Sequence, residues 1–566
     1  MSSGLDGDTL VETADRSGAF PRLDDGQLAA LEAIGERRRV QRGDVLFREG
    51  DARYDFFVIL SGKVAIVEGQ DSGRERTIGV HGERRFLGEL NLLTGQAAFL
   101  TAVVMEDGEV LAVPPERLRE LVTHDTNLGD LILRAFLLRR SVLIGLGAGF
   151  RIIGSRYAPD TRRIREFAAR NRLPHHWIDL EKDTDAEALL RELGVSPEET
   201  PVVIWRGREV LRNPSNVELA KLFGLPLPRT KDEVCDLIVV GAGPAGLAAA
   251  VYGASEGLDT LALDALATGG QAGTSSRIEN YLGFPAGVSG AELTDRAVLQ
   301  AEKFGAELTV PARATSLERR ADHYAIGLDD GQELRAHAVL IATGVQYRRL
   351  PVPRLEEFEG TSVYYAATLM EAQLCRGDPV AVVGGGNSAG QAALFLTGHA
   401  SHVDLIVREP VLSENMSRYL ADRIKRNSDI DVHLHSEVRE LCGRDALEAL
   451  VVEDNRTGDR ERIEARALFV FVGAAPHTRW LGDNMALDSG GYILTGPDAC
   501  NGDTSDDRVP LMLETSLPAV FAAGDVRSGS IKRVASAVGE GSIAIRMVHE
   551  RVGDRAGGQA VVHTQT

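Results

Sequence analysis

The sequence predicts a multidomain α/β protein whose C-terminal part holds two doubly wound sheets, preceded by a small all-β domain and a small α/β domain. Three observations carry this prediction. Strands and helices alternate from Glu233 to about Gly553, with glycine-rich strand-to-helix turns at 241–246 and 384–389. Short β-rich runs separated by glycines occupy Gln41 to about Val113, which is typical of an antiparallel barrel or jelly roll. Between 151 and 225 the order is strand, helix, strand, helix, strand, strand, helix, which indicates a compact α/β unit whose first helix is expected to bury Ile164, Phe167 and Ala168.

The chain has 566 residues, too many for one hydrophobic core, so several domains are expected. A helical stretch from Pro115 to about Ile144 is expected to follow the β-rich runs. Both ends of the chain are polar and are expected to be disordered. The expected boundaries are 1–18 for the N-terminal segment, 19–148 for the all-β jelly-roll domain, 149–226 for the small α/β domain, 227–232 for a linker, 233–346 with 473–553 for the first doubly wound domain, 347–472 for the second, and 554–566 for the tail.

The composition argues against several classes of function. A formal net charge of -20 disfavours a nucleic-acid binder, because phosphate recognition needs a basic face. The longest apolar stretch, Val142–Phe150 with its flanks, is too short and too close to Arg139 and Arg140 to span a membrane. No secretory signal is recognised, so the cytoplasm is the expected location. No metal site is expected, because the four cysteines are far apart and form no paired motif: Cys235, Cys375, Cys442 and Cys500.

The first glycine-rich turn follows the apolar strand Asp236–Val240. In this pattern Gly241 permits a tight turn, Gly243 lets a pyrophosphate approach the backbone, and Gly246 allows the helix to pack closely on the strand. A second strand ends at Asp264, where a carboxylate can accept hydrogen bonds from a ribose. The alternative is a turn that only packs a helix on a strand, but strand, glycines, helix, strand and acid together favour a dinucleotide site. The candidate contacts are Gly241, Gly243, Pro244, Ala245, Gly246 and Asp264.

The second glycine-rich turn follows the strand Val380–Val383 and leads into a helix that is expected to run to about Phe395. Ala389 occupies the third glycine position, which this fingerprint tolerates. Two such turns in one chain suggest two dinucleotides, one FAD and one nicotinamide, because each carries a pyrophosphate that needs the same cradle. The candidate contacts are Gly384, Gly386, Asn387 and Ser388.

Further segments resemble the thioredoxin-reductase-like flavoproteins, and they occur in the order of that family. They are Gly269–Gly273, Glu279–Pro285, Ala342–Gly344, Phe469–Gly473, Val520–Asp525 and Ser536–Gly541. The resemblance implies a two-dinucleotide-binding, Rossmann-like flavoprotein, with Ala342–Gly344 and Phe469–Gly473 at the two crossings between its domains. It also implies that Ser536–Gly541 begins a helix whose N-terminus stabilises the reduced flavin. The flavin contacts carried over by motif are Gly270, Gln271, Asn280, Thr343, Gly344, Gly524 and Asp525.

This resemblance implies FAD and NADPH as cofactors, with hydride passing from the nicotinamide to the flavin. Arg408 matches an arginine that clasps the 2′-phosphate of NADPH in the family, which favours NADPH while leaving NADH possible. A second arginine expected five positions later is Ser413 here, although Arg418 could take its role. A homodimer is expected, and no residue of the sequence is assigned as a catalytic acid, base or nucleophile.

The sequence departs from true thioredoxin reductases at their redox-active cysteine pair. Counting back from Gly384 places Ala367 and Met370 at the two cysteine positions, and Cys375 is alone. Thiol–disulfide exchange needs a second thiol, so an internal disulfide relay is not expected. Electrons would pass to an external acceptor, such as a ferredoxin-, flavodoxin- or thioredoxin-like protein. The alternatives are a thioredoxin-disulfide reductase type of enzyme and a flavin-containing regulatory sensor.

The small α/β domain resembles a glutaredoxin- or thioredoxin-like module. Thr200-Pro201 stands at the position of the family's cis-proline, and Ala158 stands where the family has its nucleophilic cysteine. Because alanine cannot form a thiolate, the module is expected to act as a docking or scaffold element.

The N-terminal domain resembles a cyclic-nucleotide-binding domain through Gly43-Asp44, Glu49–Asp51, Ile59–Gly62 and Phe86–Leu90. The resemblance makes Glu89 the residue that would bind the ribose. Ala98 stands at or near the position of the arginine that would pair with the cyclic phosphate, although Arg84 or Arg85 could substitute. Weak or absent binding of cyclic nucleotides is therefore expected.

Overall fold

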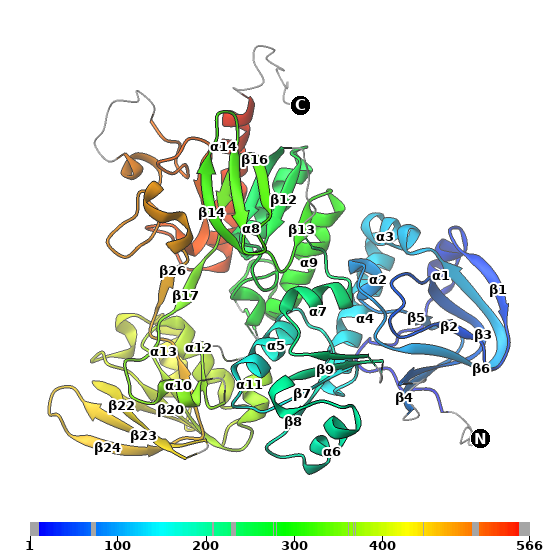
Figure 1. Cartoon of the computed structure of the whole chain (residues 1–566), viewed down its shortest axis with the longest axis horizontal. Coiled ribbons are helices and arrows are strands. Elements are labelled where there is room, and N and C mark those ends of the chain that lie inside the picture. The colour runs from blue at the N-terminus through cyan, green and yellow to red at the C-terminus, as the bar shows by residue number, and fades with distance from the viewer. Residues whose placement is uncertain are drawn as a thin grey trace. The chain divides into compact units, whose positions relative to one another are not determined.

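A computed structural model of the chain describes residues 11–553, except 70–74, 207–208, 228–233, 276, 279, 360, 366, 368, 445 and 501–508. The chain divides into two compact units, residues 1–227 and 228–566 (Figure 1). The expected tail 554–566 and nearly all of the expected linker 227–232 lie outside the described residues, as do residues 1–10. Residues 11–18, by contrast, contact the β domain, where the backbone N–H of Thr13 donates to the carbonyl of Val80 at 2.9 Å.

The first part of the N-terminal unit is a six-stranded antiparallel sheet with short helices. The sheet order is β1-β6-β3-β4, with β2 paired to β6 and β5 paired to β3. Its core is formed by alternating apolar residues such as Phe57, Ile59, Val64 and Val104, all nearly inaccessible to solvent. The elements are α1 (Asp25–Glu32), β1 (Glu36–Val40), β2 (Val45–Phe47), β3 (Phe56–Glu68), β4 (Arg76–His81), β5 (Phe86–Leu87), α2 (Asn91–Thr94), β6 (Thr101–Val113), α3 (Pro115–His124) and α4 (Thr126–Gly145).

The helical stretch expected from Pro115 to about Ile144 is divided into α3 and α4. The break lies at Asp125, which has an extended backbone. Its carboxylate accepts hydrogen bonds from the backbone N–H groups of Asn127 and Leu128, so it caps the second helix. The apolar periodicity runs through this break, which is why it predicted one helix.

The second part of the N-terminal unit is a four-stranded sheet in the order β10-β9-β7-β8, with β7 and β8 parallel. The order of elements agrees with the sequence prediction, and Ile164, Phe167 and Ala168 of α5 are fully buried as expected. The peptide bond between Thr200 and Pro201 is cis. The elements are β7 (Phe150–Gly154), α5 (Pro159–Arg170), β8 (His175–Asp179), α6 (Thr184–Glu192), β9 (Val202–Trp205), β10 (Glu209–Arg212) and α7 (Asn216–Phe223).

An aromatic cluster joins the two parts of this unit. The ring of Phe99, from the loop before β6, lies 5.6 Å from that of Trp205 and 5.9 Å from that of Phe223. Phe150 stacks on Phe223 with their ring centroids 4.4 Å apart. All four side chains are buried.

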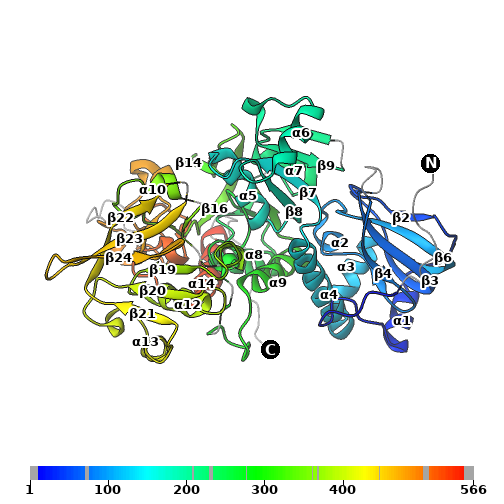
Figure 2. The same cartoon turned by 90° about the horizontal axis from the view of Figure 1, so that it is seen from below.

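The C-terminal unit contains one large mixed sheet and one parallel sheet. The first has the order β13-β12-β11-β16-β15-β14, with β27 paired to β16. Helices α8, α9 and α14 lie side by side against it in both views (Figures 1 and 2). The elements are β11 (Cys235–Val240), α8 (Pro244–Ser255), β12 (Thr260–Leu263), α9 (Gly290–Lys303), β13 (Glu307–Thr309), β14 (Ala314–Arg319), β15 (Tyr324–Leu328), β16 (Glu333–Ile341), β27 (Val520–Ala522) and α14 (Val534–Gly553).

The parallel sheet of this unit has the order β18-β25-β19-β20-β21 and is accompanied by a three-stranded antiparallel sheet. The short strands β17 and β26 pair antiparallel where the chain leaves the first sheet and returns to it, as expected for the two crossings (Figure 1). The elements are β17 (Val345–Tyr347), α10 (Leu355–Phe358), β18 (Val363–Tyr364), α11 (Leu369–Leu374), β19 (Pro379–Val383), α12 (Asn387–Leu396), β20 (His402–Ile406), α13 (Arg418–Lys425), β21 (Ile430–His433), β22 (Ser436–Gly443), β23 (Leu447–Asp454), β24 (Arg460–Glu464), β25 (Ala467–Val470) and β26 (Ala474–Pro476).

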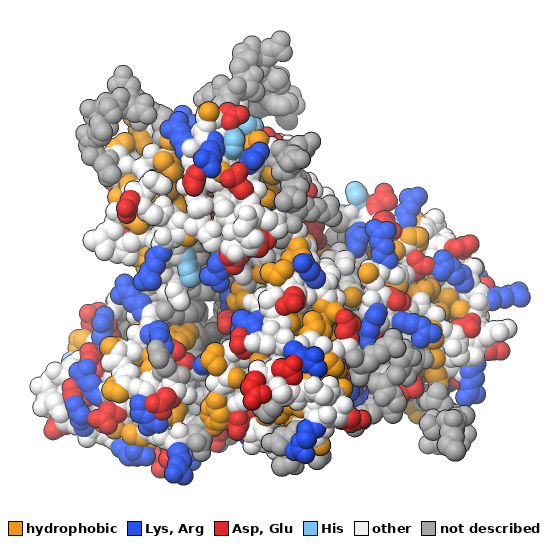
Figure 3. All heavy atoms as spheres, in the orientation of Figure 1, with side chains coloured by type: hydrophobic (Ala, Val, Ile, Leu, Met, Phe, Trp, Pro, Cys, Tyr) orange, Lys and Arg blue, Asp and Glu red, His pale blue; other side chains and the backbone are white. Residues whose placement is uncertain are grey.

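Charged side chains of both signs are interspersed on the face drawn in Figure 3. The net charge of the chain is -20, and the described residues of that face form no broad basic surface. No helix in the described part of the chain combines the length and apolar composition that a membrane span requires.

Candidate functional site

The first glycine-rich turn connects β11 to α8 in a geometry that only glycine allows. Gly241 has a φ of 107°, and a Cβ there would collide with the carbonyl oxygen of Ala342. A Cβ on Gly246 would collide with the carbonyl oxygen of Gly241. Pro244 is the first residue of α8, so the helix N-terminus and its free N–H groups face the turn.

Three other motif segments converge on this turn. The backbone N–H of Gly269 donates to the carbonyl of Ala242 at 2.7 Å. A Cβ on Gly270 would lie 3.0 Å from the Cα of Gly243, so these two loops touch through glycine backbone. The second of these segments contains Gly524, where a Cβ would lie 3.0 Å from the Cβ of Ala245. The last is Ala342–Thr343, which lies against Gly241.

Asp264 follows β12 at the expected place beside the turn. One of its carboxylate oxygens accepts a hydrogen bond from the backbone N–H of Ala242 at 3.0 Å. The other accepts from the N–H groups of Leu266 and Ala267. These bonds to backbone fix the carboxylate's orientation, which the sequence pattern could not show.

Asp525 differs from Asp264 in having no hydrogen bonds to its carboxylate among the described residues. It lies beside the first glycine-rich turn, which together with these segments forms the first cradle. Its side chain is half-buried and has no hydrogen-bond partner among the described residues, and burial raises its pKa above the ordinary value of an aspartate. The turn that carries it is held by α14, where Glu540 accepts from the backbone N–H of Gly524 at 2.7 Å and pairs with Arg527 at 2.5 Å. A sugar alcohol with several hydroxyl donors, such as the ribityl chain of FAD, would supply the missing partners. The glycine cradle and this carboxylate therefore fit FAD.

Among the remaining predicted flavin contacts, some side chains are held by hydrogen bonds to the backbone and one is exposed. The side-chain amide of Gln271 donates to the carbonyl of Val345 at 2.5 Å, and the hydroxyl of Thr343 donates to the carbonyl of His477 at 3.0 Å. Gly344 has a φ of 65°, and its carbonyl accepts from the N–H of His477. Asn280 is exposed, and its side chain makes no hydrogen bond within the described residues.

His477 also lies at this site, and no sequence motif pointed to it. Its backbone joins Thr343 and Gly344 by the two hydrogen bonds above, and burial lowers the pKa of its imidazole. A neutral imidazole is thus held where the chain returns to the first sheet.

The second glycine-rich turn connects β19 to α12. Gly384 has a φ of 143°, and a Cβ there would collide with the carbonyl oxygen of Phe471. Gly386 is the N-cap of the helix and has open space around it, so the pyrophosphate of a dinucleotide can approach the protein backbone there. Asn387 accepts a hydrogen bond from the backbone N–H of Ser417 at 2.7 Å, and Ser388 is exposed. This turn has the strand, glycines and helix N-terminus that a second dinucleotide requires.

Arg408 and Glu409 follow β20 beside the second turn. Arg408 is largely exposed, and its Nε donates to Oε1 of Glu409 at 2.9 Å, which raises the arginine's pKa. Oε2 of Glu409 is buried without a hydrogen-bond partner, and a Cβ on Gly385 would lie 2.6 Å from it. Sequence reasoning singled out Arg408 and missed Glu409, although an acid after the second strand is a recognised feature of ribose binding.

We expect these two side chains to act in opposite directions on nicotinamide preference. Arg408→Ala should raise the KM for NADPH about tenfold and leave that for NADH nearly unchanged, because it removes the cation available to a 2′-phosphate. Glu409→Gln should lower the KM for NADPH and raise that for NADH, because it removes a carboxylate that repels phosphate and accepts from a ribose hydroxyl. Steady-state kinetics with both nucleotides measures this. The control is Arg462→Ala, which removes an exposed arginine from β24. An Arg408→Ala enzyme with both KM values unchanged would contradict the assignment of Arg408.

Cys375 is packed as a small apolar side chain. It is 3 % exposed, and its thiol donates to the carbonyls of Glu371 and Ala372 within the same helical segment. Burial raises its pKa to about 11, so the thiolate is disfavoured at neutral pH. All four cysteines are free thiols.

The sequence predicted no metal site. His402, Asp404 and Asp431 nevertheless place one possible ligand atom each within 4.8 Å of one another at the edge formed by β20 and β21. These groups already form ion pairs, His402 with Asp431 at 3.2 Å and His433 with Asp404 at 2.7 Å, so the cluster needs no ion to explain it.

In the N-terminal unit, Glu89 is engaged by an arginine that sequence reasoning did not consider. Both of its carboxylate oxygens accept hydrogen bonds from Arg140 of α4, one of them at 2.8 Å from Nη2, and both side chains are buried. Arg84 donates to Leu23 and pairs with Asp25 near the surface, and Arg85 donates to the carbonyl of Thr13. Ala98 is buried in the core of the sheet.

The C-terminal unit thus has the architecture of a two-dinucleotide-binding flavoprotein. The family described as pyridine nucleotide-disulphide oxidoreductase matches residues 235–541, and the chain belongs to that family. It is an FAD-dependent NAD(P)H oxidoreductase of the thioredoxin-reductase-like type, whose members use FAD and NADPH. The family described as cyclic nucleotide-binding domain matches residues 37–125.

Three relatives each match a little over half of this chain. A 34.2 kDa protein in the rubredoxin operon of Clostridium pasteurianum is 32% identical over 57% of this chain and 99% of its own length. The thioredoxin reductase of Treponema pallidum is 33% identical over 55% of this chain and 94% of its own length. The crystal structure of Lactococcus lactis thioredoxin reductase matches with a TM-score of 0.52 and 29% identity, over 56% of this chain and 99% of that one.

Proposed function

We propose that this protein passes electrons from NADPH through FAD to an external acceptor, without an internal disulfide relay. The observation that carries the proposal is the combination of two glycine cradles in one chain with Cys375 as a lone, buried thiol. A relay through disulfide exchange requires an accessible thiolate and a resolving partner. Ala367 and Met370 replace the expected pair in the sequence.

The residues of the first cradle would hold FAD. When bound, FAD supplies the two-electron chemistry that links a reduced nicotinamide to an acceptor. Gly243 leaves room for the pyrophosphate, while Gly241 and Gly246 allow the tight turn and the close packing of the helix that form the cradle. Asp525 would accept hydrogen bonds from hydroxyl groups of the ligand. The helix α14 begins at Val534, so the predicted segment Ser536–Gly541 forms its first turns, and its N-terminal dipole would favour negative charge nearby.

The residues of the second cradle would hold NADPH. Gly384 allows the tight turn, Gly386 leaves room for the pyrophosphate at the N-terminus of α12, and Arg408 offers a guanidinium for the 2′-phosphate. Asn387 and Ser388 lie in the first turn of the helix, where their backbone N–H groups are free to bind anions.

The acceptor that we favour is a small redox protein of the ferredoxin, flavodoxin or thioredoxin kind. A relative from Clostridium pasteurianum carries the name of a rubredoxin operon, which supports an acceptor of this size and kind. We further propose that the protein is a cytoplasmic homodimer.

Turnover of the full chain with NADPH and a panel of acceptors tests the proposal. Ferricyanide, a quinone, a ferredoxin, a flavodoxin and thioredoxin would be compared at equal concentration. We expect turnover with artificial acceptors and with at least one small redox protein other than thioredoxin. Failure of NADPH to bleach the flavin absorbance in a yellow protein would rule out the proposed electron path.

Replacing the lone cysteine separates this proposal from its first alternative. Cys375→Ser is expected to leave the rate of flavin reduction by NADPH within about twofold, because the thiol is buried and protonated. Cys442→Ser, at a partly exposed cysteine outside both cradles, is the matched control. Thioredoxin turnover that is fast in the native protein and lost only in Cys375→Ser would establish a thiol relay instead.

A second candidate function, a flavin-containing regulatory sensor, is favoured by the two N-terminal domains. Ala158 has replaced the nucleophile of the α/β domain, and Ala98 stands at or near the expected position of the phosphate arginine in the β domain. A sensor would be reduced by NADPH and reoxidised slowly by every acceptor of the panel.

A further inference from the structure

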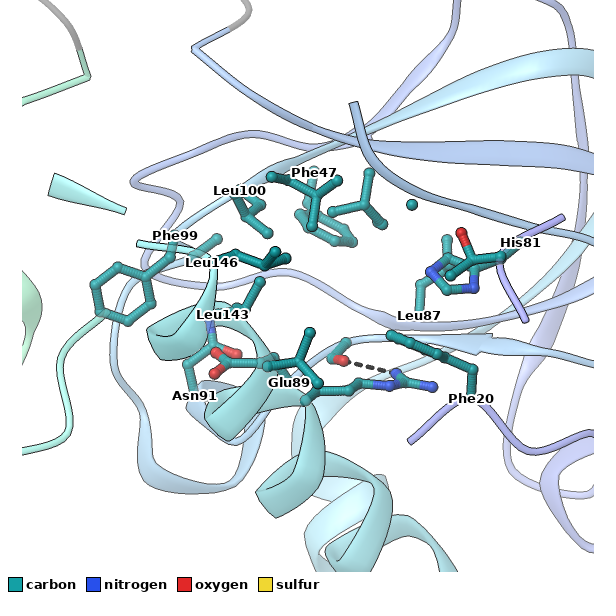
Figure 4. A pocket seen from close by; sticks show the side chains of 18 of the residues that line it. Phe20, Phe47, His81, Leu87, Glu89, Asn91, Phe99, Leu100, Leu143 and Leu146 are labelled. Atoms are coloured by element: carbon teal, nitrogen blue, oxygen red, sulfur yellow. Dashed lines mark hydrogen bonds between the residues drawn. The ribbon is translucent and has the colours of Figure 1, made fainter. Parts of the chain in front are cut away.

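The N-terminal β domain encloses a cavity of about 70 Å³ between its sheet and α4. One water molecule needs roughly 10–15 Å³ measured in the same way, so the cavity has room for a small ligand. Figure 4 shows Phe20, His81 and Leu87 at one end of the cavity, and Phe99 and Leu100 at the other.

The walls of this cavity are mainly apolar. The apolar side chains come from the segment before α1, from the strands, from the loop before β6 and from α4 and its end. They are Phe20, Phe47, Ile66, Ile78, Leu87, Ala98, Phe99, Leu100, Val142, Leu143 and Leu146. Such a lining favours an apolar body over a sugar, because sugar hydroxyls would lose their water without gaining partners.

One wall of the cavity carries a buried cation without a counterion. Arg139 of α4 is 7 % exposed and forms no ion pair with a carboxylate among the described residues. Its guanidinium donates only to backbone carbonyls, to Ala19 at 2.7 Å and to Gly88 at 2.8 Å, and its Nη2 has no hydrogen-bond partner. It lies over the ring of Phe86 with 4.4 Å between Cζ and the ring centroid.

Glu89 and Asp15 favour the charged form of Arg139 electrostatically, but neither forms an ion pair with it among the described residues. Both oxygens of Glu89 are engaged by Arg140. His81 is buried and Nδ1 has no hydrogen-bond partner, and burial lowers the pKa of its ring to about 3, so it adds no charge at neutral pH. Burial also lowers the pKa of Arg139, to about 9, which reflects the cost of keeping this charge away from water.

We propose that this cavity binds a small monocarboxylate with an apolar body, whose carboxylate pairs with Arg139. The carboxylate would pair with the guanidinium of Arg139, which lines the cavity, and the apolar body would fill the space lined by Phe47, Leu100 and Leu143. The site is distinct from both dinucleotide cradles and does not depend on the function proposed for them.

The same features disfavour a cyclic nucleotide. The carboxylate that would hold its ribose is occupied by Arg140, and Ala98 offers no charge to a phosphate. We therefore expect cyclic AMP and cyclic GMP to bind at least tenfold more weakly than a fitting carboxylate.

Isothermal titration calorimetry on the full-length, FAD-loaded chain tests the proposal. The probes are phenylacetate and hexanoate, each compared with the neutral amide of the same shape, together with cyclic AMP and cyclic GMP. We expect both carboxylates to bind with a Kd below about 1 mM and the amides to bind at least tenfold more weakly. Amides that bind as well as the carboxylates, cyclic nucleotides that bind better, or no binding of either carboxylate would overturn the proposal.

Three variants locate the site. Arg139→Gln removes the charge and should weaken carboxylate binding at least tenfold, whereas Arg134→Gln removes an exposed charge from the same helix and should change nothing. Leu143→Trp fills the cavity while keeping Arg139, so it should abolish binding even if Arg139→Gln fails to fold. Circular dichroism and flavin content report folding. Unchanged affinity in a folded Leu143→Trp protein would place the ligand elsewhere and refute the assignment.

Discussion

Asp525→Ala is expected to yield a folded protein that loses its FAD during purification. In the native chain this half-buried carboxylate has no partner among the described residues, so its acceptor capacity is available to the ligand. Each charge-assisted hydrogen bond contributes about 1.5–3 kcal/mol, which corresponds to roughly tenfold to a hundredfold in affinity per bond. The ratio of flavin absorbance at 450 nm to protein absorbance measures the loss.

Two controls make this result specific to the cofactor. Asp483→Ala removes an exposed acid from the same domain and should keep full flavin content. Asp525→Asn keeps the size of the side chain and one carbonyl acceptor, so it should retain more flavin than alanine does. An Asp525→Ala protein as yellow as the native one would remove Asp525 from the flavin site.

Glu89→Ala is expected to lower the free energy of unfolding of the N-terminal unit by about 3–5 kcal/mol, because it leaves a buried arginine without its partner. Arg140 is 2 % exposed, and both oxygens of Glu89 accept from it. Urea unfolding measured by tryptophan fluorescence reports this change, since Trp177 and Trp205 belong to the same unit.

A surface pair and a double variant separate charge burial from simple loss of a contact. Glu32→Ala breaks the exposed pair of Glu32 with Arg37, at 2.5 Å, and should cost no more than about 1 kcal/mol. The double variant Glu89→Leu with Arg140→Met replaces both charges by apolar groups and should be more stable than Glu89→Ala alone. Equal stability of Glu89→Ala and the native chain would show that Arg140 finds other partners.

Local patterns predicted much of the fold, because strands and helices here are determined by residues close in sequence. The strand Thr260–Leu263 and the burial of Ile164, Phe167 and Ala168 were predicted from apolar periodicity. The same periodicity did not reveal the break at Asp125, because capping depends on one side chain rather than on a repeating pattern.

The functional sites were predicted less completely, because their side chains are paired across long separations in sequence. The glycines of both turns could be identified, since their backbone requirement is local. The partners of Glu89 and Arg139 could not, because they depend on how α4 packs against the sheet. Sequence reasoning considered Arg84 and Arg85 as cations for the cavity, whereas the arginines that line it are Arg16 and Arg139.

The aromatic cluster of Phe99, Phe150, Trp205 and Phe223 has a consequence for dissecting the N-terminal unit. Phe99 both lines the cavity and packs against Trp205, and Arg140 donates a hydrogen bond to the carbonyl of Arg172 at 3.0 Å. A fragment ending at residue 148 would expose Phe99 to water and remove an acceptor from a buried guanidinium. The β domain and the α/β domain therefore share one core and should unfold together. A truncated β domain would differ from the native one both in stability and in what its cavity binds.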